Sequence, residues 1–193
     1  MIRPGESSKR VGTLYEMAEV LSSAVLCIAV LFTFVLRFAG VEGNSMTPTL
    51  KDKEWLAVTA ILPQPERGDI VIISPRINGH QEPLVKRVIA VGGDEIDFAN
   101  GRVLLNGAAI EEPYLPEGLE TYPANESQST MVYPARVPAG YVFVMGDNRG
   151  GSSDSRARKV GFVRADDILG KVLFRFKPFF VTQPSFAFMY QVK

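Results

Sequence analysis

The sequence contains very little cysteine and histidine, and this scarcity argues against several kinds of active site. Its one cysteine, Cys27, lies inside an apolar stretch, so the chain can form neither an internal disulfide nor a cysteine-rich metal cluster. Its one histidine, His80, lies in a polar, turn-like segment without an orienting partner nearby in sequence. A Ser-His-Asp triad stays open but has little support.

The sequence also lacks an excess of charge of either sign. Lysine and arginine together number 21, and aspartate and glutamate together number 21. The protein therefore has no net positive field that would draw it to nucleic acid, and no nucleic-acid partner is expected. With 193 residues, the chain has room for one ordinary domain and an appendage.

One long apolar stretch lies near the N-terminus. Residues 20–36 carry no charge, and Phe38 and Ala39 extend the apolar character past Arg37. About twenty apolar positions are what a helix needs to cross ~30 Å of hydrocarbon. A cleaved secretory signal, a buried core helix and an uncleaved anchor all compete for this stretch. Because residues 37–42 match a small-residue cleavage site poorly, the sequence favours the uncleaved anchor.

The flanking charges predict how this anchor is oriented. Three cations precede it, at positions 3, 9 and 10, and Arg37 closes it. The positive-inside rule then places the N-terminus in the cytoplasm. The sequence thus predicts a single-pass protein of the cell membrane in three parts: a cytoplasmic segment over 1–18, a transmembrane helix over 19–39 and an extracytoplasmic domain over 40–193.

The extracytoplasmic domain has the pattern of a mostly β fold. Beyond residue 50 the apolar runs are short, rich in valine and isoleucine, and separated by glycine, proline and asparagine. Asn100-Gly101 predicts a two-residue hairpin turn, and residues 111–140 predict a long loop or small cap. We expect strands over 54–59, 69–74, 84–91, 95–98, 102–105, 141–145 and 169–176.

Four phenylalanines gather near the end of the chain, at positions 174, 176, 179 and 180. This run is too short and too charged to span a bilayer. Aromatic residues at strand spacing are commonly core. The competing hypothesis is an interfacial aromatic patch that touches lipid.

Ser45 and Lys86 stand out as a candidate catalytic pair. Ser45 follows the apolar stretch closely, so even an extended chain keeps it within roughly 30 Å of the membrane. Strand alternation places Lys86 on one face with Leu84, Val88 and Ala90. An apolar face lowers the pKa of a lysine, and a neutral amine can take the proton from a serine hydroxyl. The competing interpretation is an ordinary lysine at a strand edge.

A dense polar loop over residues 146–156 follows the expected strand at 141–145. Loops held at the end of a strand often carry functional groups. Ser152 or Ser153 could hydrogen-bond to the lysine amine. The loop's charged residues could form pairs that hold it rigid: Asp147 or Asp154 with Arg149 or Arg156. Taken alone, the composition of this loop is equally that of a solvated turn.

Together these segments resemble the type I signal peptidases, membrane-bound serine proteases that remove signal peptides from exported proteins. Four segments look like the boxes of this family and occur in the family's order: the nucleophile box at 44–50, a strand box at 67–71, the general-base box at 86–94 and the last box at 146–156. The resemblance implies a signal-peptidase-like β-sheet catalytic domain and a Ser/Lys dyad without metal or organic cofactor.

The resemblance also implies roles for individual residues. Ser45 would be the nucleophile, Lys86 the general base and Ser152 the hydroxyl that orients Lys86. Asp154 and Arg156 would form a supporting salt bridge. The backbone N–H of Ser45 is the natural first donor to the oxyanion. Two positions depart from the family: Gly43 stands where some members have a serine donor, and Gly150-Gly151 replaces more polar residues.

The implied substrates are signal peptides of exported preproteins, with small residues one and three positions before the cut. We expect them to add along a free strand edge and to enter pockets lined by Met46, Ile73 and Leu84, with the lipid bilayer as the second partner. Two alternatives stay open. One is a self-cleaving, repressor-type Ser/Lys protease, and the other is a membrane-tethered β-domain that binds exported chains without cutting them.

Overall fold

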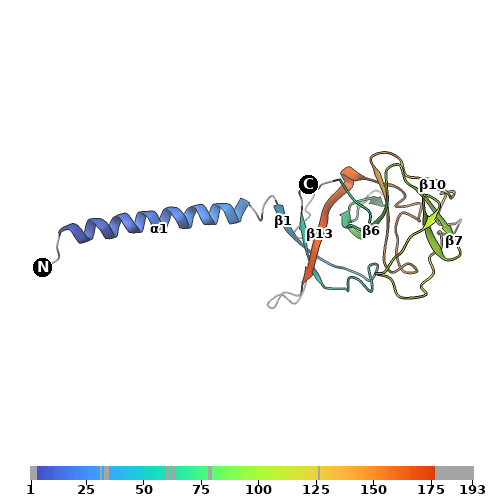
Figure 1. The fold of residues 1–193 in the computed structure, drawn as a ribbon, viewed down its shortest axis with the longest axis horizontal. Helices are drawn as coiled ribbons and strands as arrows, with labels where there is room; N and C mark the ends of the chain where they lie inside the picture. Colours follow the sequence, from blue (N-terminus) through green and yellow to red (C-terminus); the bar gives the residue numbers. More distant parts are fainter. Residues whose placement is uncertain are drawn as a thin grey trace.

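The computed structural model describes residues 4–30, 32, 35–59, 61, 64–77, 80–125 and 127–176. One long helix is followed by strands throughout the rest of the described chain (Figure 1). The elements are α1 (Pro4–Val30), β1 (Leu36–Gly40), β2 (Trp55–Thr59), β3 (Ile70–Ile73), β4 (Arg76–Ile77), β5 (His80–Gln81), β6 (Leu84–Val91), β7 (Glu95–Ala99), β8 (Arg102–Leu105), β9 (Ala108–Ala109), β10 (Ala135–Arg136), β11 (Tyr141–Met145), β12 (Val163–Arg164), the short 3-10 helix η2 (Ala165–Asp167) and β13 (Ile168–Phe176).

Helix α1 projects away from the β domain (Figure 1). Its residues Gly12–Val30 are long and apolar enough to cross a membrane, with a mean hydropathy of 1.5, and none of this window is buried. The core helix of a soluble protein would be mostly buried. The buried-core interpretation of this stretch is therefore wrong.

The expected boundaries of the anchor, 19–39, are also wrong. The helix begins at Pro4 and ends at Val30, and Leu36–Gly40 form strand β1 instead of its last turns. Strand β1 pairs antiparallel with β2, from Leu36 opposite Thr59 to Gly40 opposite Trp55. Its Ala39 is buried in the core. The apolar run that looked like one span is thus divided between a helix and a core strand.

Most of the β domain is one antiparallel sheet. Its strand order is β1-β2-β13-β3-β6-β11-β12, and a four-stranded sheet, β10-β7-β8-β9, carries β7 and β10 at the end away from α1 (Figure 1). The expected mostly β fold is confirmed. Strands β6, β8 and β11 have the predicted bounds, and β2, β3, β7 and β13 differ from prediction by one residue at one or both ends. The two-residue strands were too short for sequence patterns to reveal.

The predicted hairpin turn at residues 100–101 is confirmed. Asn100 and Gly101 join β7 to β8 with φ angles of 52° and 71°, which is the left-handed turn predicted for this pair. Within residues 111–140 the described chain is loop apart from β10. The terminal aromatic residues divide: Phe176 packs edge-on against Phe38, with ring centroids 5.5 Å apart, whereas Phe174 is 57 % exposed. Residues 179 and 180 lie outside the described chain.

Strand β6 carries a bulge that changes which side chains share a face with Lys86. Opposite β11, Val88 pairs with Val144 and Ala90 pairs with Phe143, so Ile89 is the extra residue. Leu84 and Val88 pack with one core cluster, whereas Ala90 belongs to another. The prediction that Ala90 lies on the face of Lys86 is therefore wrong, because the bulge reverses the alternation beyond Val88.

Candidate active site

Ser45 and Lys86 meet across the fold. The Lys86 Nζ lies 2.8 Å from Ser45 Oγ and donates a hydrogen bond to the carbonyl of Val85 at 3.0 Å. Lys86 is 1 % exposed, and Ser45 is half-buried. Strand β6 holds the lysine, while the serine begins a turn between β1 and β2. The two residues are thus within the hydrogen-bonding distance that proton transfer requires.

Burial sets the protonation of this lysine. Loss of hydration lowers the pKa of Lys86 from 10.5 to about 8, and the nearby negative charge of Asp154 opposes that shift. A lowered pKa was predicted from the apolar face. An appreciable fraction of Lys86 is therefore a neutral amine at mildly alkaline pH, and that amine can act as a base.

The turn that carries Ser45 is held from below by core residues. Met46 is 1 % exposed and Leu50 is 2 % exposed, and both pack in the cluster that also contains Leu56 and Val58 of β2. The Leu50 N–H donates to the carbonyl of Met46 at 2.9 Å. Since these anchors are buried, the position of Ser45 is fixed by the sheet beneath it.

The backbone N–H groups of Gly43 and Ser45 differ in whether they are free to donate. Gly43 has a φ of 84°, and its N–H donates to Asp52 Oδ1 at 2.9 Å. In the described part of the chain the N–H of Ser45 has no such partner. Of these two groups, only the Ser45 N–H is available to a developing oxyanion.

The loop after β11 is attached directly to the Ser45 turn. The backbone N–H of Asn148 donates to the carbonyl of Ser45 at 3.0 Å, and its Nδ2 donates to the carbonyl of Asn44 at 3.1 Å. A Cβ on Gly146 would overlap both Ser152 Oγ and the carbonyl oxygen of Ser45. The close approach of loop and turn therefore requires a glycine at this position.

Asp154 and Arg156 form the ion pair that was expected. Two hydrogen bonds of 2.9 Å join the guanidinium to the carboxylate, and both residues are buried. Asp154 also accepts from the Gly146 N–H at 3.0 Å, and Arg156 donates to the carbonyl of Arg149 at 2.8 Å. The pair therefore connects both sides of the loop that faces Ser45.

Ser152 does not make the expected hydrogen bond to Lys86. The Ser152 Oγ is buried and has no hydrogen-bond partner among the residues that the structure describes, and the same is true of Ser153 Oγ. The described partners of the Lys86 amine are Ser45 Oγ and the Val85 carbonyl. Ser152 nevertheless lies beside the site, next to Gly146.

Asp147 has a partner that the sequence did not suggest. It pairs with Arg87 of β6 through hydrogen bonds of 2.9 and 2.7 Å, and it also accepts from the hydroxyl of Thr49. Of the pairings that the sequence left open for this loop, the structure shows that of Asp154 with Arg156 and not one of Asp147 with either arginine. The sequence did contain a signal that Arg87 would have a partner different from that of Lys86. The two cations are adjacent in an apolar strand, and strand alternation sends their side chains to opposite faces.

Arg149 joins the polar loop to the 111–140 excursion. Its guanidinium donates to Glu112 at 2.9 Å, to Thr121 Oγ1 at 2.8 Å and to the carbonyl of Gly146 at 3.1 Å. From the same excursion, the ring of Tyr114 covers the Arg87 guanidinium at 3.8 Å. This part of the excursion is therefore a lateral support for the candidate site.

The structure places the three predicted pocket residues in different environments. Met46 and Ile73 are 1 % and 0 % exposed, so both are core residues that a substrate does not reach as they stand. Leu84 is half-buried and keeps part of its side chain at the surface. Sequence alternation alone could not separate the two cases, because the sheet is covered on both faces near Ile73.

Comparison with known proteins shows which family this chain resembles. Residues 14–177 match the family "Signal peptidase, peptidase S26". "Signal peptidase I U" of Bacillus subtilis (strain 168) is 37 % identical over 166 residues, which cover 83 % of this chain and 87 % of that protein. "Signal peptidase IB" of Staphylococcus aureus is 35 % identical over 179 residues, 85 % of this chain and 91 % of that protein.

A crystal structure of a signal peptidase I from Enterococcus faecalis V583 is 27 % identical and covers 58 % of this chain and 99 % of that one, with a TM-score of 0.47. The family match covers more than half of the chain, and both relatives exceed 30 % identity over most of their length. The resemblance drawn from the sequence motifs is confirmed. The chain belongs to the signal peptidase family, peptidase S26, and is an enzyme of the signal peptidase I type.

Proposed function

We propose that this protein is a membrane-bound serine endopeptidase that removes signal peptides from exported preproteins, with Ser45 as nucleophile and Lys86 as general base. The observation that carries the proposal is the 2.8 Å contact between Lys86 Nζ and Ser45 Oγ. It is supported by the burial that lowers the pKa of Lys86 to about 8. Neither group requires a metal or an organic cofactor for this chemistry.

Acylation follows from the positions of these two groups. The neutral Lys86 amine takes the proton as Ser45 Oγ attacks the carbonyl carbon of the last signal-peptide residue. The oxyanion forms beside the free N–H of Ser45. When the C–N bond breaks, the Lys86 ammonium returns its proton to the departing amine of the mature chain. The signal peptide is left as an ester on Ser45.

Deacylation reverses these roles with water. Lys86 takes a proton from a water molecule as its oxygen attacks the ester carbonyl, and the same proton then returns to Ser45 Oγ. The signal peptide leaves with a new carboxylate. Asp154 favours the transient ammonium of Lys86 in both steps, because its charge raises the pKa that burial lowers.

Ser152 supports the ammonium form of Lys86 in this scheme. A neutral amine has two N–H donors and one lone pair, and protonation converts the lone pair into a third donor. In the described site the amine already has Val85 O as an acceptor, and the buried Ser152 Oγ is an unused acceptor beside Gly146. We therefore expect Ser152 Oγ to accept from the third N–H once the ammonium forms.

The substrate arrives through the membrane. Helix α1 anchors the protein by a single span, with the N-terminus in the cytoplasm and the β domain outside. The cations at positions 3, 9 and 10 and the complete exposure of Gly12–Val30 support this topology. Leu84 is half-buried and is the predicted pocket residue that a small substrate residue before the cut can contact. Protease added outside intact cells is then expected to degrade the β domain and to spare the N-terminus.

The test of this function is cleavage of a preprotein by the purified full-length chain. Wild type should release the mature protein, whereas Ser45→Ala and Lys86→Ala should each lose about 10³-fold or more of kcat. Cleavage that survives either substitution would contradict the assignment of Ser45 and Lys86 as the catalytic dyad. Binding without cleavage by wild type would favour the non-catalytic alternative, and cutting confined to the enzyme's own chain would favour the self-cleaving one.

A further inference from the structure

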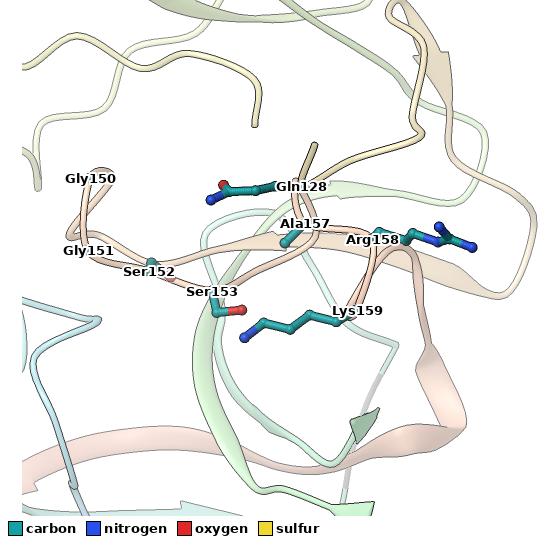
Figure 2. A pocket seen from close by; sticks show the side chains of 8 residues that line it. All are labelled: Gln128, Gly150, Gly151, Ser152, Ser153, Ala157, Arg158 and Lys159. Carbon is teal, nitrogen blue, oxygen red and sulfur yellow. The ribbon is translucent and has the colours of Figure 1, made fainter. Parts of the chain in front are cut away.

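A cavity of about 770 Å³ opens next to the polar loop, and Ser152 is the one lining residue that it shares with the chemistry described above. Its walls are the tip of that loop, Gln128 of the excursion and the segment that follows Arg156 (Figure 2). The lining residues are Gln128, Gly150, Gly151, Ser152, Ser153, Ala157, Arg158 and Lys159. This lining contains two cations and no carboxylate.

Four side chains of this cavity have polar groups without a partner in the described chain. Neither Arg158 nor Lys159 forms an ion pair through its side chain there. The buried hydroxyls of Ser152 and Ser153 lack hydrogen-bond partners. Figure 2 shows the Lys159 side chain extending toward the Ser153 hydroxyl, while Arg158 points away from the loop. A lysine and a hydroxyl that converge without an acceptor are the donors that a carboxylate requires.

The cavity adjoins the candidate active site through Ser152. That residue lines the cavity, and its hydroxyl also lies against Gly146 and close to the carbonyl of Ser45. A peptide bound in extended form advances ~3.5 Å per residue. A substrate whose scissile bond is at Ser45 can therefore place a side chain in this cavity only a few residues from the cut.

We propose that this cavity is a specificity subsite for an acidic side chain at the start of the mature segment of the substrate. The inference rests on the proposed function. A signal peptide has a basic N-terminal region, an apolar core and small residues before the cut, and none of these supplies a carboxylate. An Asp or Glu that reaches Lys159 beside Ser153 must therefore come from the chain that follows the cleavage site.

Gly150 offers a way to occupy the subsite from within the enzyme. A Cβ added at Gly150 meets nothing within 4 Å, whereas one at Gly151 would lie 2.7 Å from Asn148 Nδ2. Gly150→Asp therefore adds a carboxylate to the cavity wall without a steric conflict, and Gly150→Asn adds the same volume without charge. The glycine pair that departs from the family pattern is what leaves this space open.

The experiment uses full-length enzyme and preproteins that carry Glu or Gln at each of the first four mature positions. At one position, wild type is expected to show about a threefold higher kcat/KM for the Glu substrate, and added salt should reduce this preference. Lys159→Gln and Gly150→Asp should abolish the preference while cleaving the Gln substrates normally. Arg136→Gln and Gly150→Asn should retain it, because Arg136 does not line the cavity.

The outcomes separate this inference from the function on which it rests. Equal cleavage of Glu and Gln substrates at all four positions would overturn the subsite and leave the peptidase function intact. Lys159→Gln could instead change cleavage of the Glu and Gln substrates equally, and only when the vesicles contain anionic lipid. That result would assign the cavity to a lipid headgroup and would also overturn the acidic-residue subsite. Failure of wild type to cleave any preprotein would overturn the proposed function and the subsite together.

Discussion

Arg87 and Asp147 form a buried, two-bonded ion pair immediately beside the candidate base. Their side chains are 9 % and 0 % exposed, respectively. Arg87 follows Lys86 in β6, and Asp147 also binds the hydroxyl of Thr49 in the nucleophile turn. One carboxylate thus ties together the strand of the base, the turn of the nucleophile and the loop after β11.

Breaking this pair should damage both stability and activity. We expect Asp147→Asn to lower the free energy of unfolding by about 3–5 kcal/mol, because Arg87 is left buried and uncompensated. The double variant Arg87→Met/Asp147→Leu should recover much of that stability but not the activity, since the three segments lose their shared anchor. Urea unfolding and preprotein cleavage measure the two effects. Full activity in the stable double variant would contradict the positioning role.

The pH profile should report the protonation of Lys86. Below about pH 8 most of this residue is the ammonium form, which cannot accept the serine proton. We therefore expect kcat/KM for preprotein cleavage to rise about tenfold per pH unit through neutrality and to level above about pH 8. A profile with its maximum below about pH 6 would contradict a lysine base.

Lys86 should reduce stability at neutral pH. Burial lowers its pKa from 10.5, the ordinary value for an exposed lysine, to about 8 in the folded protein, so between these values the unfolded chain binds more protons and stability rises with pH. We expect Lys86→Met to be inactive but to gain about 3 kcal/mol in free energy of unfolding at pH 7. This gain in free energy of unfolding should vanish above pH 10.5. As a control, Lys51→Met, at an exposed lysine, should show no pH-dependent gain.

Ser152 offers a separate test of the orienting hydroxyl. Because its Oγ has no hydrogen-bond partner among the described residues, Ser152→Ala should change the free energy of unfolding by less than about 0.5 kcal/mol. If the hydroxyl accepts from the Lys86 ammonium, the same change should lower kcat and move the pH profile to lower pH. Ser152→Thr, which keeps a hydroxyl, should restore part of kcat. An unchanged profile in Ser152→Ala would remove Ser152 from the mechanism.

The exposed end of β13 should contribute to membrane contact. Leu173 and Phe174 are 51 % and 57 % exposed, and Figure 1 shows β13 on the side of the domain from which α1 leaves. We expect Leu173→Ser/Phe174→Ser to reduce cleavage several-fold in lipid vesicles and to leave detergent activity unchanged. Vesicle flotation and cleavage assays measure this. Equal loss in detergent and lipid would indicate a folding defect instead.

Local patterns were sufficient for much of the catalytic domain. Valine- and isoleucine-rich runs separated by turn residues predicted β2, β3, β6, β7, β8, β11 and β13, because strand periodicity and turn chemistry are written in neighbouring residues. An apolar face around Lys86 likewise predicted a lowered pKa. The motif order that accompanies Ser45 identified the family without any structural information.

Long-range pairing decided what neighbouring residues do not encode. Leu36–Gly40 form a strand only because β2 supplies its partner, and the bulge at Ile89 exists only opposite β11. Asp147 pairs with Arg87 although Arg149 is nearer in sequence, because β6 brings the Arg87 guanidinium into the same buried space. Neighbouring residues were enough to identify the candidate nucleophile and base and most of the strands around them. The 2.8 Å contact between them, the unpartnered hydroxyl of Ser152 and the burial of Met46 and Ile73 arise from the folding of the whole domain, because each depends on residues distant along the chain.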